Sequence, residues 1–343
     1  MNKIYEIALM LQTRRPAFSN TEEAFIEDYL EPLGVERDDY GNVIKRIGDN
    51  PKVMWSSHTD SVHKYDGYQA VKIKGQYAML NDGSSNCLGA DDVSGVWLMM
   101  EMIRAGKEGL YVFHRCEERG GKGSAYIAAN TPELLQGIKC VIALDRRGTR
   151  DVITHQSGGR CCSDLFGDSL GQAIGMKHKR CDGGVFTDSA NYTDLVGECT
   201  NLSVGYEMEH SKNEKTDLAF LVNMSKALIA LNYDELAYSR QPGELDPEEY
   251  IWSNKKYGGR YSEYYEDDYA KYCTRDYTAS IVFEEPKKEE PKKEEVVEEE
   301  SAWTLEEYCV TYGDVVARIL EDCGYTEENI AEEVYKQTGE YTY

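Results

Sequence analysis

The chain has 343 residues, which is enough for one sizeable domain with appendages or for two modest domains. Its formal net charge is −24, and most of the acidity lies in residues 235–343, which carry 29 acidic and 12 basic side chains. Such a surface repels nucleic-acid phosphates and anionic lipid, and no basic stripe counters it. The composition therefore argues against nucleic-acid and membrane partners.

The sequence indicates a cytoplasmic location. Residues 1–15 mix charged and apolar side chains, so they do not resemble a secretory signal, and no run of about 18 apolar residues predicts a membrane span. The ten cysteines are irregularly spaced and include no C-x-x-C pair. In a reducing compartment we expect free thiols, mostly buried as small apolar side chains.

Residues 1–234 predict one alternating α/β domain. Apolar residues at helical spacing from Ile4 to Leu11 predict a first helix, and a second is expected to start with Asn20 as its N-cap and to end at Gly34. Five strands are expected, at Val43–Ile47, Val53–Ser56, Leu110–Phe113, Val141–Leu144 and Leu202–Val204. Further helices are expected at Val93–Ile103, Ser124–Ala129 and Leu218–Leu231. The alternation predicts a largely parallel mixed sheet with helices on both faces.

The character of the chain changes after residue 234. Residues 235–283 form an acidic extension rich in tyrosine, and residues 284–300 contain two EEPKK units, which are typical of a charged, solvated linker. Residues 301–343 regain apolar periodicity and predict a small helical module. This module is the candidate site for a protein partner.

Histidine and carboxylate side chains gather at the ends of the predicted strands. The carboxyl ends of the strands form the ligand-binding edge of an open α/β sheet. The residues concerned are His58, Asp60, Asp91, Glu117, Glu118, Asp145 and His210. Imidazole nitrogen and carboxylate oxygen are ligands of zinc, and two metal ions can share one carboxylate. The sequence therefore predicts a metal site at this edge.

Three motifs make the pattern specific. Ser57-His58-Thr59-Asp60 resembles an H-x-D motif, and Gly89-Ala90-Asp91-Asp92, followed by Gly95, resembles G-A-D-D-x-x-G. Residues 117–124 match E-E-x-G-x-x-G-S. Their order and spacing, over roughly residues 1–234, resemble the zinc-dependent exopeptidase superfamily of dizinc metallopeptidases. Bacterial leucyl aminopeptidases, peptidase T-like tripeptidases and glutamate carboxypeptidase-type enzymes are similar.

The resemblance implies two divalent metal ions. His58 and Asp145 would hold one ion, Glu118 and His210 would hold the other, and Asp91 would bridge them. Zinc is the default for these ligands, and cobalt or manganese would also suit them.

The resemblance also implies the roles of two further carboxylates. Glu117 would be the general base, and Asp60 would orient the imidazole of His58. In relatives the peptide bond after the bridging aspartate is often cis, so an unusual Asp91–Asp92 link is expected.

The spacing of the last two ligands favours a compact arrangement. His210 follows Asp145 by only 65 positions, which is too few for the lid domain that carboxypeptidase-type relatives insert there. Another group would therefore have to stabilise the oxyanion, and Tyr192 and Tyr206 are the candidates for this substrate contact.

Three functions are open from the sequence. The leading hypothesis is a hydrolase that removes terminal residues from short peptides, in the manner of an aminopeptidase. The same scaffold could instead cleave an acylated amino acid, or serve as an inactive binding protein. Each motif alone is weak, because a G-A-D-D turn can be a helix cap and Asp145 an ordinary acid at a strand end. The other histidines, His63, His114, His155 and His178, are expected to be structural or exposed.

Overall fold

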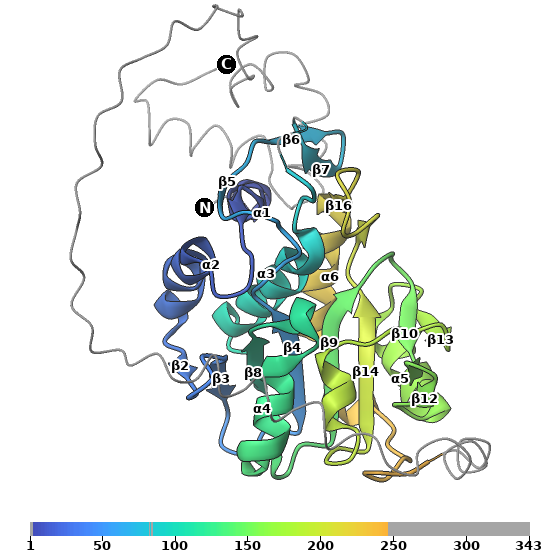
Figure 1. Cartoon of the computed structure of the whole chain (residues 1–343). Coiled ribbons are helices and arrows are strands. Elements are labelled where there is room, and N and C mark those ends of the chain that lie inside the picture. The colour runs from blue at the N-terminus through green and yellow to red at the C-terminus, as the bar shows by residue number, and fades with distance from the viewer. Residues whose placement is uncertain (1–2, 82, 84, 246–343) are drawn as a thin grey trace, which may run out of the picture. The chain divides into compact units, whose positions relative to one another are not determined.

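The main sheet of the computed structural model, which describes residues 3–81, 83 and 85–245, has eight strands in this part of the chain. From one edge to the other they are β13 (Lys179–Cys181), β10 (Asp151–Ile153), β14 (Glu198–Ser203), β9 (Cys140–Arg146), β4 (Val53–His58), β8 (Gly109–His114), β3 (Val43–Ile47) and β2 (Glu36–Arg37). The four central strands are parallel, whereas β10 and β3 run antiparallel to their inner neighbours. This confirms the predicted mixed sheet (Figure 1).

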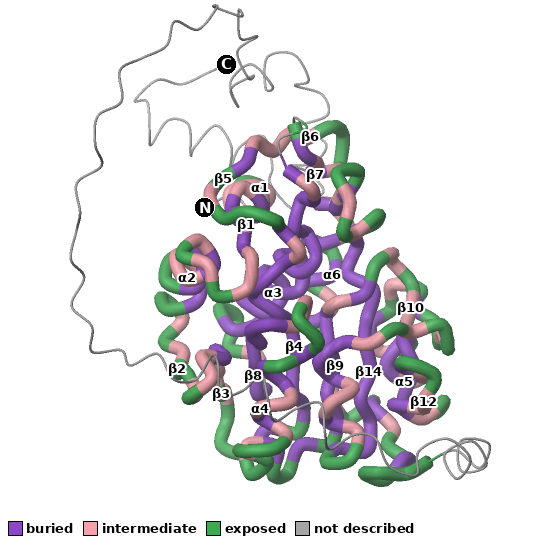
Figure 2. The backbone as a smooth tube through the Cα atoms, in the orientation of Figure 1, coloured by how far each residue is buried: buried purple, intermediate pink, exposed green. Residues whose placement is uncertain are grey.

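The central strands form the buried middle of the domain. Every residue of β4, β8 and β14 is buried, as Figure 2 shows in purple. Strands that are covered on both faces need continuous apolar runs rather than alternation, and Val53–Trp55 of β4 and Leu110–Phe113 of β8 provide such runs.

Helices cover both faces of the sheet. Met54 packs in a core cluster with Ile127 of α4 (Lys122–Asn130), whereas its neighbour Trp55 donates a hydrogen bond to Tyr233. Adjacent strand residues point to opposite faces, so α4 and Tyr233 lie on opposite sides. The side of Tyr233 carries α6 (Leu218–Ala230), which packs on α3 (Ala90–Arg104) and α1 (Lys3–Leu11).

A second, smaller sheet is antiparallel. Its described strands, in spatial order, are β15 (Tyr206–Glu207), β16 (Lys215–Asp217), β7 (Tyr77–Leu80) and β6 (Val71–Lys74). Short two-stranded pairs are formed by β1 (Thr13–Arg14) with β5 (Gly67–Tyr68) and by β11 (His155–Gln156) with β12 (Gly159–Arg160). The small sheet matters for the site because the connection from β15 to β16 carries His210.

The second predicted helix differs in detail from the expectation. Ser19, not Asn20, is the N-cap of α2 (Asn20–Phe25), because its hydroxyl accepts a hydrogen bond from the amide of Glu22 at 3.1 Å. The chain continues through a π-helical segment and a 3₁₀ turn, and it ends in the left-handed conformation at Gly34, as predicted. The sequence analysis did not predict α5 (Asp164–Ile174).

Ordered structure continues beyond residue 234. We call residues 236–245 the strap. The carboxylate of Glu198, at the start of β14, accepts hydrogen bonds from the amides of Ser239 and Arg240 at 2.8 and 2.9 Å. Arg240 donates to the carbonyl of Gly197 at 2.8 Å, so the strap is fastened to the sheet.

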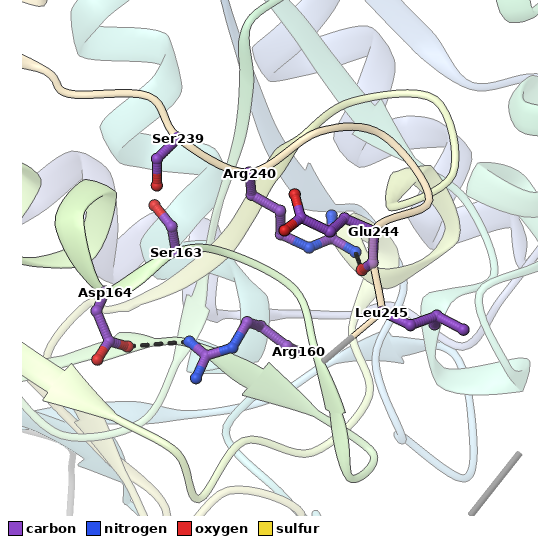
Figure 3. A pocket seen from close by; sticks show the side chains of 7 residues that line it. All are labelled: Arg160, Ser163, Asp164, Ser239, Arg240, Glu244 and Leu245. Atoms are coloured by element: carbon purple, nitrogen blue, oxygen red, sulfur yellow. Dashed lines mark hydrogen bonds and ion pairs between the residues drawn. The ribbon is translucent and has the colours of Figure 1, made fainter. Parts of the chain in front are cut away.

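The strap closes one side of a cavity of about 190 Å³. Its lining, drawn in Figure 3, contains no predicted site residue and comprises Arg160, Ser163, Asp164, Ser239, Arg240, Glu244 and Leu245. The rest of the tyrosine-rich extension, the linker and the helical module lie outside the described residues. Among the residues that are described, no helix is long and apolar enough to cross a membrane.

Candidate metal centre

The predicted ligands come together at the carboxyl edge of the main sheet. His58 ends β4, Asp145 lies near the end of β9, and Glu118 belongs to the 3₁₀ turn Glu117–Arg119 that follows β8. Asp91 stands in the first turn of α3. His210 arrives from the small sheet, so the cluster joins both sheets.

Asp91 lies between the two histidines. Its Oδ1 is 2.9 Å from Nε2 of His58, and its Oδ2 is 3.2 Å from Nε2 of His210. Each histidine also meets a second acid, because His58 Nε2 is 3.6 Å from Asp145 and His210 Nε2 is 2.9 Å from Glu118. Two His–carboxylate pairs therefore share the central carboxylate of Asp91.

The donor atoms fit a cation. One atom from each of His58, Asp91 and Glu118 lies within 4.8 Å of the others, and the same holds for His58, Asp92 and Asp145. Imidazole nitrogens with carboxylate oxygens at such spacing are the donors that zinc takes. The residues present can hold a metal ion of this kind.

Asp92 was not predicted as part of the site. Its Oδ2 accepts hydrogen bonds from the hydroxyl of Ser57 at 2.5 Å and from the amide of His58 at 3.3 Å. Its Oδ1 accepts from the amide of Gly95 at 2.9 Å. Because these donors already engage both oxygens, we assign Asp92 to fixing His58 against the start of α3. The peptide bond between Asp91 and Asp92 is cis, as expected.

Asp60 supports two parts of the site at once. Its carbonyl and carboxylate oxygens lie 3.1 and 3.5 Å from Nδ1 of His58, which leaves Nε2 of the imidazole directed at the cluster. The same carboxylate accepts the amide hydrogens of Glu117 at 3.0 Å and Glu118 at 3.3 Å. One buried carboxylate therefore sets the positions of the imidazole and the two glutamates.

The cluster concentrates negative charge. Burial and the nearby charges of Asp145, Asp188 and Glu118 raise the pKa of Glu117 well above its ordinary value. Burial, together with Asp91, raises the pKa of Asp145 to about 6 and that of Glu118 to about 7. Carboxylates that repel each other in a buried site are what a divalent cation would stabilise.

Of the two predicted tyrosines, only Tyr206 meets the cluster. Its hydroxyl donates to Oδ1 of Asp145 at 3.0 Å, and Thr187 donates to Oδ2 of the same carboxylate at 2.6 Å. The contribution of Thr187 was missed, although it stands in the glycine-rich loop before Asp188. Tyr192 is fully buried, and its hydroxyl pairs with Nε2 of His114 at 2.7 Å. Its hydroxyl is therefore engaged by His114 rather than by a predicted metal ligand.

His114 and Asp188 belong to a buried polar network beside the cluster. Asp188 lies 3.3 Å from Nδ1 of His114 and accepts a hydrogen bond from Ser124 at 2.5 Å. His178 is also buried, with Nε2 3.2 Å from the carbonyl of Ser203. These two histidines are core residues, in line with the expectation.

Comparison with known proteins agrees with the motifs. The model of peptidase family M28 matches residues 42–189, a span that includes His58, Asp91 and Asp145. The fold is similar to aminopeptidase PepT from Bacillus cereus, with a TM-score of 0.54 and 17% identity over 66% of this chain and 96% of that one. The motifs and the fold of this chain resemble those of the zinc exopeptidase superfamily.

Two further solved structures share the fold at low sequence identity. A tripeptidase from Staphylococcus aureus has a TM-score of 0.55 and 14% identity, and the match covers 66% of this chain and 96% of that one. A TET aminopeptidase from a marine-sediment thaumarchaeon has a TM-score of 0.51 and 14% identity, covering 68% and 99%. No curated protein matches the sequence significantly.

Proposed function

We propose that the protein is a two-metal aminopeptidase that acts on short peptides. The observation that best supports this proposal is the position of Asp91. Its two carboxylate oxygens contact different histidines, and each histidine also lies near another acidic side chain. In the proposal, His58 and Asp145 hold one ion, His210 and Glu118 hold the other, and Asp91 bridges. The titles of the similar structures, an aminopeptidase and a tripeptidase, support the substrate class.

The proposed cofactor is a pair of divalent ions, with zinc the first choice and cobalt or manganese also suited to the ligands. When bound, such ions polarise the scissile carbonyl and lower the pKa of water. The protein's own contribution is then to fix the ligands, to accept a proton and to return it.

Glu117 is the proposed general base. It is partly buried beside the cluster, and its raised pKa favours proton uptake. Its backbone is held by Asp60, which keeps the carboxylate near the ligands. Glu117 takes a proton from water and returns it to the leaving amine. Tyr206 remains the candidate for stabilising the oxyanion, because its hydroxyl lies at Asp145.

The change of Glu117 to Ala is expected to abolish turnover and to leave the metal content unchanged. General acid–base catalysis contributes about 10²–10⁴-fold, so the loss should be of that size. The measurement is mass spectrometry of a defined peptide pool incubated with zinc and with the wild-type or Glu117→Ala protein. Elemental analysis of both proteins checks the metals, with His210→Ala as the control that should lose metal.

The same experiment shows from which end of the peptide the residues are removed. Ladders shortened from the amino end, absent with Glu117→Ala, would support an aminopeptidase. Ladders shortened from the carboxyl end would replace that assignment. Unaltered turnover in Glu117→Ala would overturn the proposed base. Hydrolysis of acylated amino acids, with an untouched peptide pool, would instead identify a deacylase on this scaffold.

We also propose a cytoplasmic location and a protein partner for the helical module of residues 301–343. The location is supported by the seven described cysteines, all of which are free thiols. The partner rests on the sequence pattern alone. Affinity capture with residues 284–343 present or deleted from the whole chain would test it.

A further inference from the structure

The candidate metal centre is assembled from two sheets. His58 and Asp145 belong to strands of the main sheet, whereas His210 lies in the connection from β15 to β16 of the small sheet. His210 is half exposed, its side chain showing 50% of its surface. Something must therefore hold this connection against the start of α3, where Asp91 stands.

Glu214 makes that link. It lies four residues after His210 and is 1% exposed. Its Oε2 accepts hydrogen bonds from the amides of Leu88 at 2.8 Å and Gly89 at 3.0 Å, and its Oε1 accepts from the amide of Asp91 at 2.9 Å. Both carboxyl oxygens therefore act as acceptors, which fixes the side chain of Glu214 against this segment. Three converging amides also provide the polar environment that a buried carboxylate needs.

The carbonyl groups of the Leu88–Asp91 segment are held by other residues, independently of Glu214. Gln69 donates to the carbonyl of Leu88 at 2.7 Å, and Arg15 donates to the carbonyl of Gly89 at 2.9 Å. Gly89 has φ +75°, and a Cβ there would lie 2.7 Å from Cε1 of His63, so the segment requires glycine. Because the segment is held from behind, its amides form a rigid receptor for a carboxylate from the small sheet.

We propose that Glu214 is a positioning residue that keeps His210 in place opposite Asp91 and thereby sets the affinity for the ion that His210 holds. The inference rests on the proposed two-metal function. It predicts an asymmetry, because the pair formed by His58 and Asp145 is supported by Asp60, Tyr206 and Thr187 rather than by Glu214. Loss of Glu214 should weaken the binding of the ion held by His210 more than the binding of the ion held by His58 and Asp145.

The test is a metal titration of the whole chain that requires no turnover. Glu214→Gln keeps the size of the side chain but turns an amide nitrogen toward backbone donors. Asp217→Asn is the matched control, since Asp217 is an acid on the same hairpin whose carboxylate accepts from the amide of Phe220 at 2.9 Å instead. Each metal-free protein is titrated with zinc against a chromophoric chelator, which yields two stepwise dissociation constants.

We expect Glu214→Gln to weaken the binding of one zinc equivalent about 10–100-fold, the usual effect of removing a partner that orients a ligand, and to weaken the binding of the other much less. Asp217→Asn should bind like the wild type. Glu214→Asp, which keeps the charge but shortens its reach, should show the same asymmetry if the glutamine variant folds poorly. Hydrogen exchange in the metal-free Glu214→Gln protein should quicken at Leu88, Gly89 and Asp91.

Two results would overturn the inference and leave the proposed function intact. In the first, the two zinc dissociation constants of Glu214→Gln equal those of the wild type. The other is an equal weakening of both ions with a lower melting temperature of the metal-free protein, because that pattern marks a general structural role. A wild-type chain that binds no zinc would overturn the proposed function, and this inference with it.

Discussion

At the scale of single residues, His63 shows how a histidine near a site serves the fold. His63 follows His58 by five residues, which suggests a place at the mouth of the site, yet it is only 2% exposed. Its Nδ1 accepts the amide hydrogen of Arg15 at 3.2 Å, and its Nε2 lies 3.1 Å from the carbonyl of Cys87. Burial, with the nearby charge of Arg15, lowers the pKa of His63 to about 3.

This shift predicts acid sensitivity. Between pH 6.5, where an unfolded histidine titrates, and about 3, the unfolded chain binds a proton at His63 that the folded chain does not. The stability from neutral His63 is therefore complete above pH 6.5 and is lost as the pH falls toward 3. Denaturant unfolding of the metal-free protein at pH 7 and pH 5 measures this loss. The free energy of unfolding should fall by about 2 kcal/mol less in His63→Gln than in the wild type.

The exposed, non-titrating Gln136 provides the control for that measurement, and Gln136→Ala should follow the wild-type pH dependence. An acid-induced loss in His63→Gln as large as that of the wild type would contradict the assignment.

At the scale of elements, the contact of α3 with β9 leaves no room for a side chain at Gly95. A Cβ on this residue would lie 2.1 Å from the carbonyl oxygen of Leu144 and 2.6 Å from the carboxylate of Asp92. The helix can therefore deliver Asp91 to the strand ends only because glycine lets it approach so closely.

Gly95→Ala is expected to destabilise the protein by about 1–3 kcal/mol or more, as overpacking of a tight contact does, and to weaken zinc binding through Asp91. Urea unfolding measures the first effect and a zinc titration the second. Gly183→Ala is the control, because a Cβ there would meet only Sγ of Cys181 at 3.6 Å. Equal stability of the two variants would argue against the packing explanation.

Apolar runs and turn residues predicted the main elements because local sequence determines them. Val43–Ile47 matches β3 to the residue, and the predicted helix at Val93–Ile103 lies inside α3. By contrast, α5 was not predicted, because Gly167 and Gly171 lie inside it and glycine is unfavourable in a helix. A Cβ at Gly171 would lie 2.7 Å from the carbonyl of His178, so a distant contact selects the glycine.

The candidate site shows the same division between local and distant causes. The gathering of His58, Asp91 and Asp145 follows from the order of strands along the chain, since parallel strands end at one edge. The supporting contacts do not follow from it. Asp92 meets Ser57 across 35 positions, and Thr187 meets Asp145 across 42, so only the folded chain brings these partners together.

At the scale of the whole molecule, the strap decides where the folded unit ends. Glu198 is fully buried and accepts hydrogen bonds from two strap amides and from the amide and hydroxyl of Ser163, so removal of the strap would remove the first two. A typical hydrogen bond contributes about 0.5–1.5 kcal/mol to stability. The boundary at residue 234 that the sequence suggested is therefore less secure than one at residue 245.

A chain of residues 1–245 should fold and bind zinc like the full chain, whereas a chain of residues 1–234 should melt at a lower temperature. Thermal unfolding of both, with circular dichroism at 25 °C to check folding, provides the measurement. The full chain carrying Glu198→Gln is the control for the strap contact and should fall between them. Equal melting temperatures of the two shortened chains would show that the strap adds no stability.

The two edge strands of the main sheet affect how readily copies of this protein aggregate at high concentration. Both edge strands are short: β2 has two residues, both exposed, and β13 has three, of which two are exposed. Both strands are charged: β2 contains one acidic and one basic residue, Glu36 and Arg37, and β13 contains two basic residues, Lys179 and Arg180. A short, charged edge is a poor template for another strand, so the long buried strands between are shielded from edge-to-edge aggregation.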